Sequence, residues 1–236
     1  MSYILIIFII GLLILIHEAG HFIAARAAGI PIEIFSIGFG PALWKKRIGE
    51  TEYRFSLVPV GGYVLPAAAN EQEFYAIPVN RRILFSLGGP AANIILTLVL
   101  LSILNAINSG FSPAAAFIEP FRQTGLLMYK ITASLAGLFT NPGKISGILG
   151  ITRDGSRFIG GDVLRAVQFS AILSANLAVF NLLPLPVLDG GKIILGMLEK
   201  VSRRMTAYYL PIIIAGWVFI IGLMVYATVL DIVRMS

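Results

Sequence analysis

The chain has no cysteine and only two histidines among its 236 residues. Disulfide bonds, cysteine nucleophiles and thiolate metal sites are therefore excluded. Charge is also scarce: 13% of the residues are charged, against roughly 25% in an average soluble domain. The net charge of +6 comes without a basic run interleaved with aromatic residues, so nucleic-acid binding is not expected.

What the sequence has in excess is apolar residues, which make up 57% of the chain and give a mean hydropathy of +0.87. Such a composition needs a solvent other than water and predicts a polytopic membrane protein. Four apolar segments are long enough to cross a hydrocarbon core of about 30 Å as helices. These predicted spans are residues 2–28, 83–107, 163–183 and 207–229.

Three connecting segments have patterns of their own. Residues 51–65 contain β-branched and aromatic residues around a Gly-Gly pair, which predicts a short hairpin or paired strands. Residues 121–140 repeat apolar side chains at helical spacing between polar ones, which predicts an amphipathic helix at the membrane interface. Residues 141–161 are rich in glycine and are expected to form a loop. The predicted fold is an all-α polytopic membrane protein with about four transmembrane helices, a small membrane-associated β element and an interfacial helix.

Basic residues predict the orientation of the spans. Lysines and arginines gather between the first and second spans and just before the fourth, with a few more between the second and third. The positive-inside rule therefore favours a cytoplasmic location for the first and third connections, with both termini outside.

The first span contains the sequence His17-Glu18-Ala19-Gly20-His21, an HExxH pattern. Positions four apart lie on one face of a helix, so His17 and His21 can bind one Zn²⁺. Glu18 is close enough to that face to accept a proton from a metal-bound water. Ionisable residues inside an apolar span are costly and by default indicate a functional site. The alternative is a polar patch that packs against another helix through hydrogen bonds.

The position of His17 along the span predicts its depth in the membrane. The uncharged run from Tyr3 to Ile16 corresponds to about 21 Å of helix. If the span begins at the outer interface, the metal lies past the midplane and nearer the cytoplasmic side. Small residues around the motif would let a neighbouring helix approach closely, so the site is expected inside the protein.

A catalytic zinc with two histidine ligands needs one more ligand from the protein. Without other histidines or any cysteine, this ligand should be an aspartate or a glutamate. The best placed is Asp189, which follows two helix-breaking prolines at the expected cytoplasmic end of the third span. Its expected depth matches that of His17. The alternative for Asp189 is a turn or helix-cap residue before Gly-Gly.

Several motifs in a fixed order resemble the site-2 protease family of intramembrane zinc metalloproteases, and most closely its bacterial regulator of sigma-E protease group. The resemblance covers nearly the whole chain and is far more specific than HExxH alone. The motifs are HEAGH at 17–21, FSIGFGPALW at 35–44, PVGGYV at 59–64, GPAAN at 89–93 and NLLPLPVLDGG at 181–191.

This resemblance implies one Zn²⁺ per chain, bound by His17, His21 and Asp189, with Glu18 as the general base. The implied activity is hydrolysis of peptide bonds in or near transmembrane segments of single-span membrane proteins, such as anti-sigma factors or remnant signal peptides. The implied location is the lipid bilayer of a bacterial inner membrane.

The same resemblance implies a substrate-binding region. Asn181 would hold the substrate or the developing oxyanion, and Gly61, Gly62 and Tyr63 would belong to a β element whose edge pairs with an unwound substrate strand. Alternatives remain open for these residues: a structural hydrogen bond for Asn181 and a plain turn for the glycines.

The chain departs from the family in one respect. Members of this group usually carry one or more PDZ domains between the second and third spans, but the connection from Gly110 to Ala114 leaves no room for one. Residues 1–236 are therefore expected to form a single protease domain. Two other functions stay open: a catalytically silent relative that binds membrane helices, disfavoured by the intact Glu18, and a metal transporter, disfavoured because no further ligands lie inside a span.

Overall fold

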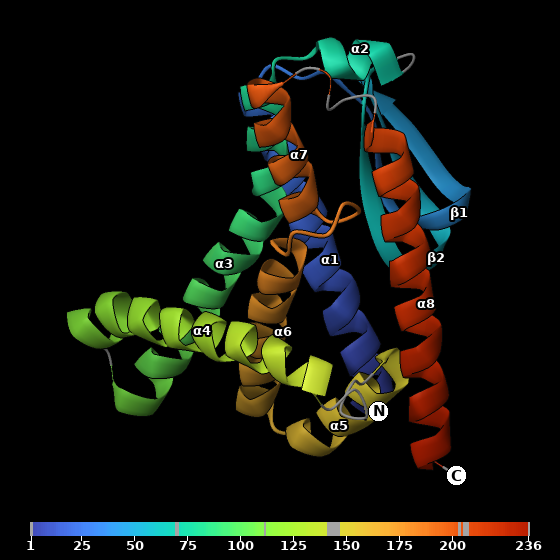
Figure 1. The fold of residues 1–236 in the computed structure, drawn as a ribbon. Coiled ribbons are helices and arrows are strands. Elements are labelled where there is room, and N and C mark those ends of the chain that lie inside the picture. Colours follow the sequence, from blue (N-terminus) through green and yellow to red (C-terminus); the bar gives the residue numbers. More distant parts are fainter. Residues whose placement is uncertain are drawn as a thin grey trace. The chain divides into compact units, whose positions relative to one another are not determined.

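The structure is a computed structural model that describes residues 2–68, 71–110, 112–140, 147–202, 204 and 208–235. Over these residues the chain forms eight α-helices, a short π-helix and two long strands (Figure 1). In chain order the elements are α1 Ser2–Ala27, β1 Ile32–Ile48, β2 Thr51–Pro66, α2 Glu71–Ala76, α3 Val79–Ser109, η1 Ala114–Ile118, α4 Glu119–Thr140, α5 Ile148–Ile159, α6 Val163–Asn181, α7 Asp189–Val201 and α8 Tyr209–Met235.

Four of these helices are long and apolar enough to cross a membrane, and they coincide with the four predicted spans. They cover Tyr3–Ala27, Val79–Asn108, Val163–Asn181 and Tyr209–Arg234. The predicted fold class, an all-α polytopic membrane protein with a small β element, is thus confirmed. The second helix begins four residues earlier than expected, because its basic first turn is still helical.

The glycine-rich segment 141–161 was predicted to be a loop, but part of it is helical. Residues 148–159 form α5, while 141–146 lie outside the described residues. Two of the glycines flank this helix: Gly147 precedes it, and Gly160 ends it in a left-handed conformation with φ of 54°. Glycine favours that position because it has no Cβ to clash there. The predicted helix at 121–140 is confirmed as α4, and its place at the membrane interface stays a prediction.

The chain divides into two compact units. The first comprises residues 1–9, 94–179 and 214–236, and the second comprises residues 10–93 and 180–213. In the first unit, Ile131 of α4 packs with Ala175 and Val179 of α6 in a buried apolar cluster. The buried Asp231 of α8 accepts a 2.8 Å hydrogen bond from the backbone N–H of Gly150 in α5.

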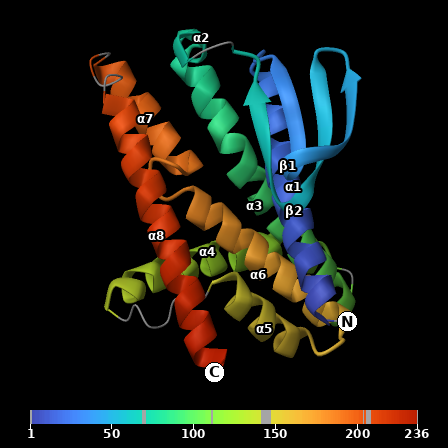
Figure 2. The same ribbon diagram turned by 90° about the vertical axis from the view of Figure 1, so that its right-hand side faces the viewer.

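In the second unit, α1 and α3 approach each other backbone to backbone (Figure 2). A Cβ on Gly20 would overlap the carbonyl oxygen of Gly88 and lie 2.6 Å from the Cβ of Ala92. A Cβ on Gly88 would likewise overlap the carbonyl oxygen of Gly20 and lie 2.6 Å from the Cβ of Ala24. Small residues at a helix crossing allow this approach in membrane proteins, where close packing replaces the hydrophobic driving force.

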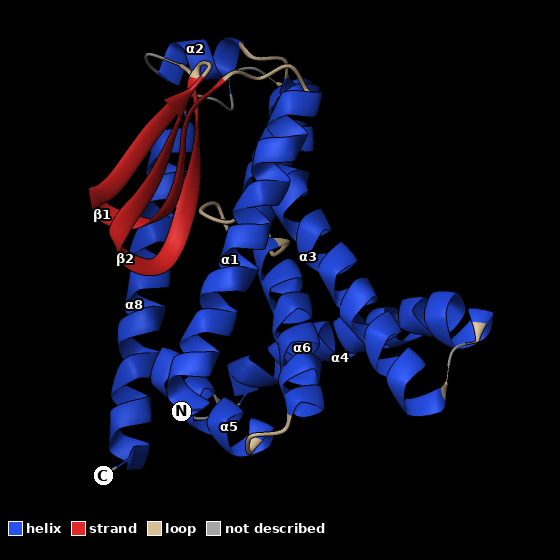
Figure 3. Cartoon of the chain, turned by 180° about the vertical axis from the view of Figure 1, so that it is seen from behind, coloured by secondary structure: helices blue, strands red, loops and turns tan. Residues whose placement is uncertain are grey.

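The two strands form one sheet in the second unit (Figure 3). Each residue of 34–37 has two partners, one in 52–55 and one in 62–65, so the first half of β1 lies between the two halves of β2. In the pairing that the structure describes, residues 62–66 have partners only in β1, so their other side is an edge of the sheet. Residues 51–65, predicted as a short hairpin or paired strands, are extended as predicted but form the single long strand β2, whose two halves both pair with β1. The partner strand β1 was not predicted.

Aromatic rings hold this sheet on α1. The ring of Phe22 in α1 lies 5.4 Å from the ring of Phe35 in β1 and 6.0 Å from that of Tyr53 in β2. The latter two rings are 5.9 Å apart, which completes a triangle of contacts. Such offset and edge-to-face pairs add to the stabilisation from burial alone. The sheet is therefore anchored at the residue that directly follows the HExxH sequence.

A largely buried ion pair joins α7 to α3 in the same unit. Arg82 donates to Glu199 at 2.6 Å and to the carbonyl oxygen of Ile77 at 3.0 Å. Tyr209 donates to the carbonyl oxygen of Leu195 and lies 3.4 Å from the Glu199 carboxylate. Removing one partner of such a pair leaves an uncompensated charge, so loss of Arg82 or Glu199 alone should destabilise the contact between α7 and α3.

Candidate metal centre

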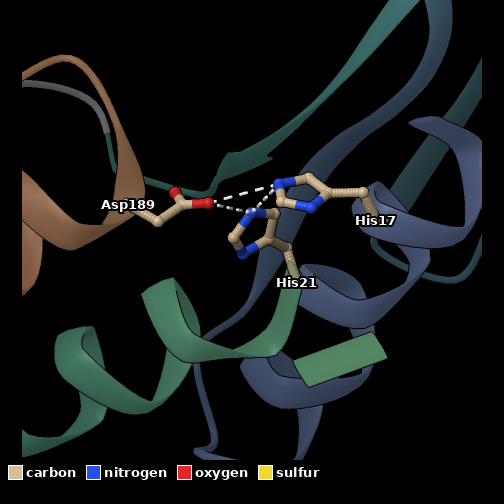
Figure 4. Close-up of side chains that lie close together, drawn as sticks. All are labelled: His17, His21 and Asp189. Atoms are coloured by element: carbon tan, nitrogen blue, oxygen red, sulfur yellow. Dashed lines mark hydrogen bonds and ion pairs between the residues drawn. The ribbon is translucent and has the colours of Figure 1, made fainter. Parts of the chain in front are cut away.

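In the second unit, Asp189 of α7 meets two histidines of α1 that lie far from it in the sequence, His17 and His21 (Figure 4). The Nε2 atoms of His17 and His21 lie 3.2 Å and 3.1 Å from Oδ2 of Asp189. The two Nε2 atoms are 3.1 Å apart. All three residues are buried, with exposed fractions of 8%, 6% and 3%.

The triangle of donor atoms fits one zinc ion. Bonds from zinc to nitrogen or oxygen are about 2.0–2.2 Å, so neighbouring ligands of a tetrahedral zinc lie about 3.3 Å apart. The three separations of 3.1–3.2 Å agree with this spacing. Two imidazoles and one carboxylate are also a donor set typical of catalytic zinc, in which a position remains open for water.

Helical periodicity brings the two histidines together, since they are four residues apart on α1. The position of Asp189 differs from the expected one at the end of the third span. It does not end the third span but is the first residue of a separate helix, α7, which follows the non-helical residues 182–188. The two prolines in that segment interrupt the helix between α6 and α7.

The glycines after Asp189 let this segment fold back over the start of α7. A Cβ on Gly190 would overlap the carbonyl oxygen of Leu182, and a Cβ on Gly191 would overlap that of Leu185. Both overlaps involve backbone atoms, which have little freedom to move. The Asp-Gly-Gly sequence therefore sets the direction from which the carboxylate enters the site.

Lys192 and the two histidines share the carboxylate of Asp189. Lys192 donates to Oδ1 at 3.1 Å, while Oδ2 faces the imidazoles. Burial by itself raises the pKa of Asp189, but the hydrogen bonds from His17 and His21 and the charge of Lys192 outweigh burial and hold the pKa below its usual range. The group is thus an anion, as a zinc ligand must be.

Helix α3 supplies a second set of contacts that the sequence did not reveal. The imidazole Nδ1 of His21 lies 2.8 Å from the carbonyl oxygen of Phe85, which can accept its proton and leave Nε2 for a metal. One turn further on, a Cβ on Gly89 would lie 2.5 Å from Nε2 of His21 and 2.6 Å from Nε2 of His17. Gly89 therefore keeps open the space in front of the metal-binding nitrogens. The GPAAN motif carried this signal, but without a partner helix its role could not be seen.

Glu18 lies where α1 meets the sheet. A Cβ on Gly62 of β2 would be 2.9 Å from Cγ of Glu18, so the bare backbone of this glycine makes room for the glutamate side chain. Of the predicted substrate-binding residues, Gly62 is thus next to the HExxH sequence.

The other predicted substrate-binding residues have structural contacts of their own. Gly61 lies under the ring of Phe39, where any Cβ would overlap that ring. Tyr63 stacks on Phe39 with ring centroids 6.2 Å apart and pairs with Ser36 in the sheet. Asn181 is the last residue of α6, immediately before the segment that leads to Asp189.

Comparisons with known proteins agree with this geometry. The family description "Peptidase family M50" matches residues 5–227, which is nearly the whole chain. A Clostridium perfringens protein named "Putative zinc metalloprotease CPE1693" is 28% identical over 321 aligned positions, which cover 94% of this chain and 95% of that protein. Because 94% of 236 residues is about 222, about 100 aligned positions of that relative lie opposite gaps in this chain.

Two other relatives match over shorter stretches. A Chlamydia pneumoniae protein that also has the name of a zinc metalloprotease is 43% identical over 112 residues, or 40% of this chain and 18% of that protein. "Protease RseP" of Yersinia pestis is 42% identical over 100 residues, or 38% of this chain and 22% of that protein. These matches and the four apolar helices support an intramembrane zinc metalloprotease function and a multi-pass membrane protein, as the motifs predicted. The chain belongs to peptidase family M50.

Proposed function

We propose that this chain hydrolyses peptide bonds in or near transmembrane segments of other membrane proteins, with one zinc ion held by His17, His21 and Asp189. The observation that carries the proposal is the buried triangle of these three ligand atoms on and beside an apolar helix. Desolvated ionisable groups in such a helix are costly unless they serve a function.

Glu18 is the proposed general base. A zinc ion in this site would supply Lewis acidity toward a water molecule and toward the scissile carbonyl. The Glu18 carboxylate accepts the proton of the attacking water and returns it to the nitrogen of the leaving amine. Its position next to His17 on α1 and against Gly62 on β2 supports this role.

The sheet is the proposed place where the substrate pairs. A helical substrate must unwind locally before water can reach a peptide bond in it, and unwinding breaks backbone hydrogen bonds of the helix. If the unwound segment pairs with the sheet as an added strand, it forms backbone hydrogen bonds again. The open side of residues 62–66 offers such an edge, and Gly62 lies at one end of it, beside Glu18. Asn181 is proposed to hold the substrate or the oxyanion. Gly61 and Tyr63 support the edge through Phe39.

The substrates that we propose are single-span membrane proteins, such as anti-sigma factors or remnant signal peptides. The proposed location is a bacterial inner membrane, with both termini outside and the site nearer the cytoplasm. This orientation rests on the basic residues that flank the spans. Residues 1–236 are proposed to act as a single domain without a PDZ domain.

The proposal is tested by comparing Glu18→Gln with Glu33→Gln, a control at an exposed glutamate on β1. Each variant is co-expressed with a panel of single-span segments that carry reporter tags, and its zinc content is measured by mass spectrometry. We expect Glu18→Gln to keep its zinc but to cleave about 10²–10⁴-fold more slowly, because a general base contributes that much. Glu33→Gln should cleave like the wild type.

Two results would contradict the proposal. If Glu18→Gln cleaves at the wild-type rate, Glu18 is not the general base. If the folded wild-type protein binds no zinc, the hypothesis of a catalytic zinc site is wrong, and a catalytically silent relative that binds membrane helices is favoured.

A further inference from the structure

Asn93 of α3 is a buried polar residue next to the metal centre, and the chemistry of the site described so far does not use it. Its exposed fraction is 0%. Its side-chain amide nitrogen lies 3.2 Å from Nδ1 of His17, the ring atom that points away from Asp189. Asn93 therefore contacts the proposed ligand His17 on the side of the imidazole that faces away from the metal site.

Helical spacing on α3 explains why this contact falls on His17. Phe85, Gly89 and Asn93 are four residues apart, so they lie on one face of α3. The first contacts His21 through its carbonyl oxygen, and the second leaves room in front of both imidazoles. The third reaches His17, one turn earlier on α1 than His21. The close crossing at Gly20 and Gly88 brings the two helices near enough for all three contacts.

The tautomer of the neutral His17 ring decides whether Asn93 must donate or accept a hydrogen bond. When Nε2 binds a metal, the ring proton of a neutral imidazole sits on Nδ1 and needs an acceptor. With the ring proton on Nε2 instead, Nδ1 accepts from the amide nitrogen of Asn93, which is the contact that the structure shows. A half-turn of the amide presents its oxygen to Nδ1–H. A side-chain amide can thus serve both states of His17, whereas a lysine could only donate and a carboxylate could only accept.

We propose that Asn93 is a positioning residue that accepts a hydrogen bond from Nδ1–H of His17, and so holds the imidazole in the tautomer and orientation that bind zinc. This inference rests on the proposed zinc site. Partners of this kind on the outer side of a ligand typically change metal affinity by about 10–100-fold. The buried position strengthens the effect, since a buried N–H without an acceptor is unfavourable.

The test measures zinc affinity in the full-length detergent-solubilised protein, by competition with a chromophoric chelator. Asn93→Leu keeps the approximate volume but removes the acceptor, so its zinc dissociation constant should rise about 10–100-fold. Asn93→Asp restores an acceptor and should bind zinc at least as tightly as the wild type. Thr97→Val, a buried polar site one turn further along α3 whose hydroxyl donates to Ala171, is the control and should not change the affinity.

The pair of Asn93 variants separates positioning from packing. If Asn93 only fills space, the buried charge of Asn93→Asp should damage the protein more than Asn93→Leu does, and this order would overturn the inference. Equal zinc affinity in wild type and a folded Asn93→Leu, as judged by circular dichroism and gel filtration, would overturn it too. A wild type without zinc would instead defeat the proposed function, so the two failures are distinguishable.

Discussion

Helices α1 and α8 contain equally apolar stretches, yet 28% of that stretch is buried in α1 and only 11% in α8. The two helices also differ in which residues are buried. Along α1 the small and ionisable residues meet other parts of the protein, while large apolar side chains of α8, such as Trp217 and Val218, are exposed. Hydropathy therefore identifies both helices as spans, and the HExxH pattern of α1 indicates which one carries the metal site.

One glycine from each helix makes the contrast concrete. A Cβ on Gly20 of α1 would overlap the backbone of α3, whereas a Cβ on Gly222 of α8 would meet nothing within 4 Å. Gly20 is thus required by a helix crossing, and Gly222 is not required by any contact in the described part of the chain. The same residue type has a packing role in one helix and none in the other.

The largest effect is expected on zinc binding, when Gly89→Ala beside the metal site is compared with Gly222→Ala in α8. The added Cβ at residue 89 would lie within 2.5–2.6 Å of both Nε2 atoms and would take the space of the zinc. We expect the zinc dissociation constant of Gly89→Ala to rise by at least about 100-fold, more than for loss of an outer partner, while Gly222→Ala binds zinc like the wild type. Competition with a chelator measures both, and wild-type affinity in Gly89→Ala would show that this space is not needed.

A smaller effect, with opposite signs in the two helices, should come from Gly20→Ala and Gly222→Ala on stability. Overpacking costs about 1–3 kcal/mol, and Gly20→Ala should reach the upper end because its Cβ meets backbone atoms. Gly222→Ala should be neutral or stabilising by up to about 1 kcal/mol, because alanine is the better helix former. Unfolding in mixed detergent micelles measures both variants, and equal stability would mean that α1 and α3 can separate without loss.

The smallest effect should come from truncating single leucines, Leu13→Ala in α1 and Leu210→Ala in α8. Leu13 is 2% exposed and Leu210 is 54% exposed. Leu13→Ala should cost about 2 kcal/mol, at the low end for a buried leucine, because lipid already solvates the side chain in the unfolded state. Leu210→Ala should cost less than about 0.5 kcal/mol. The same micelle assay applies, and comparable losses would contradict the view that α8 is the less packed helix.

Local patterns were enough to predict much of this protein. The four spans follow from apolar length, and the pairing of His17 with His21 follows from a spacing of four on a helix. Asp189 was singled out as the best-placed carboxylate, and the structure brings it to the two histidines, although it begins α7 instead of ending a span. The strand β1 was missed even though Ile32, Ile34 and Ser36 alternate as buried residues along it.

The sequence by itself determined the membrane environment of the protein, its four spans and the types of metal ligand. These properties depend on residue character and on spacing within one element. Only the tertiary structure decided what lies beside the site: Phe85, Gly89 and Asn93 on α3, and Gly62 against Glu18. These contacts depend on how closely two helices cross and on how a sheet is anchored. The Gly20–Gly88 crossing and the contact of Phe22 with Tyr53 join residues that are 68 and 31 positions apart, and no periodicity within either segment specifies its partner.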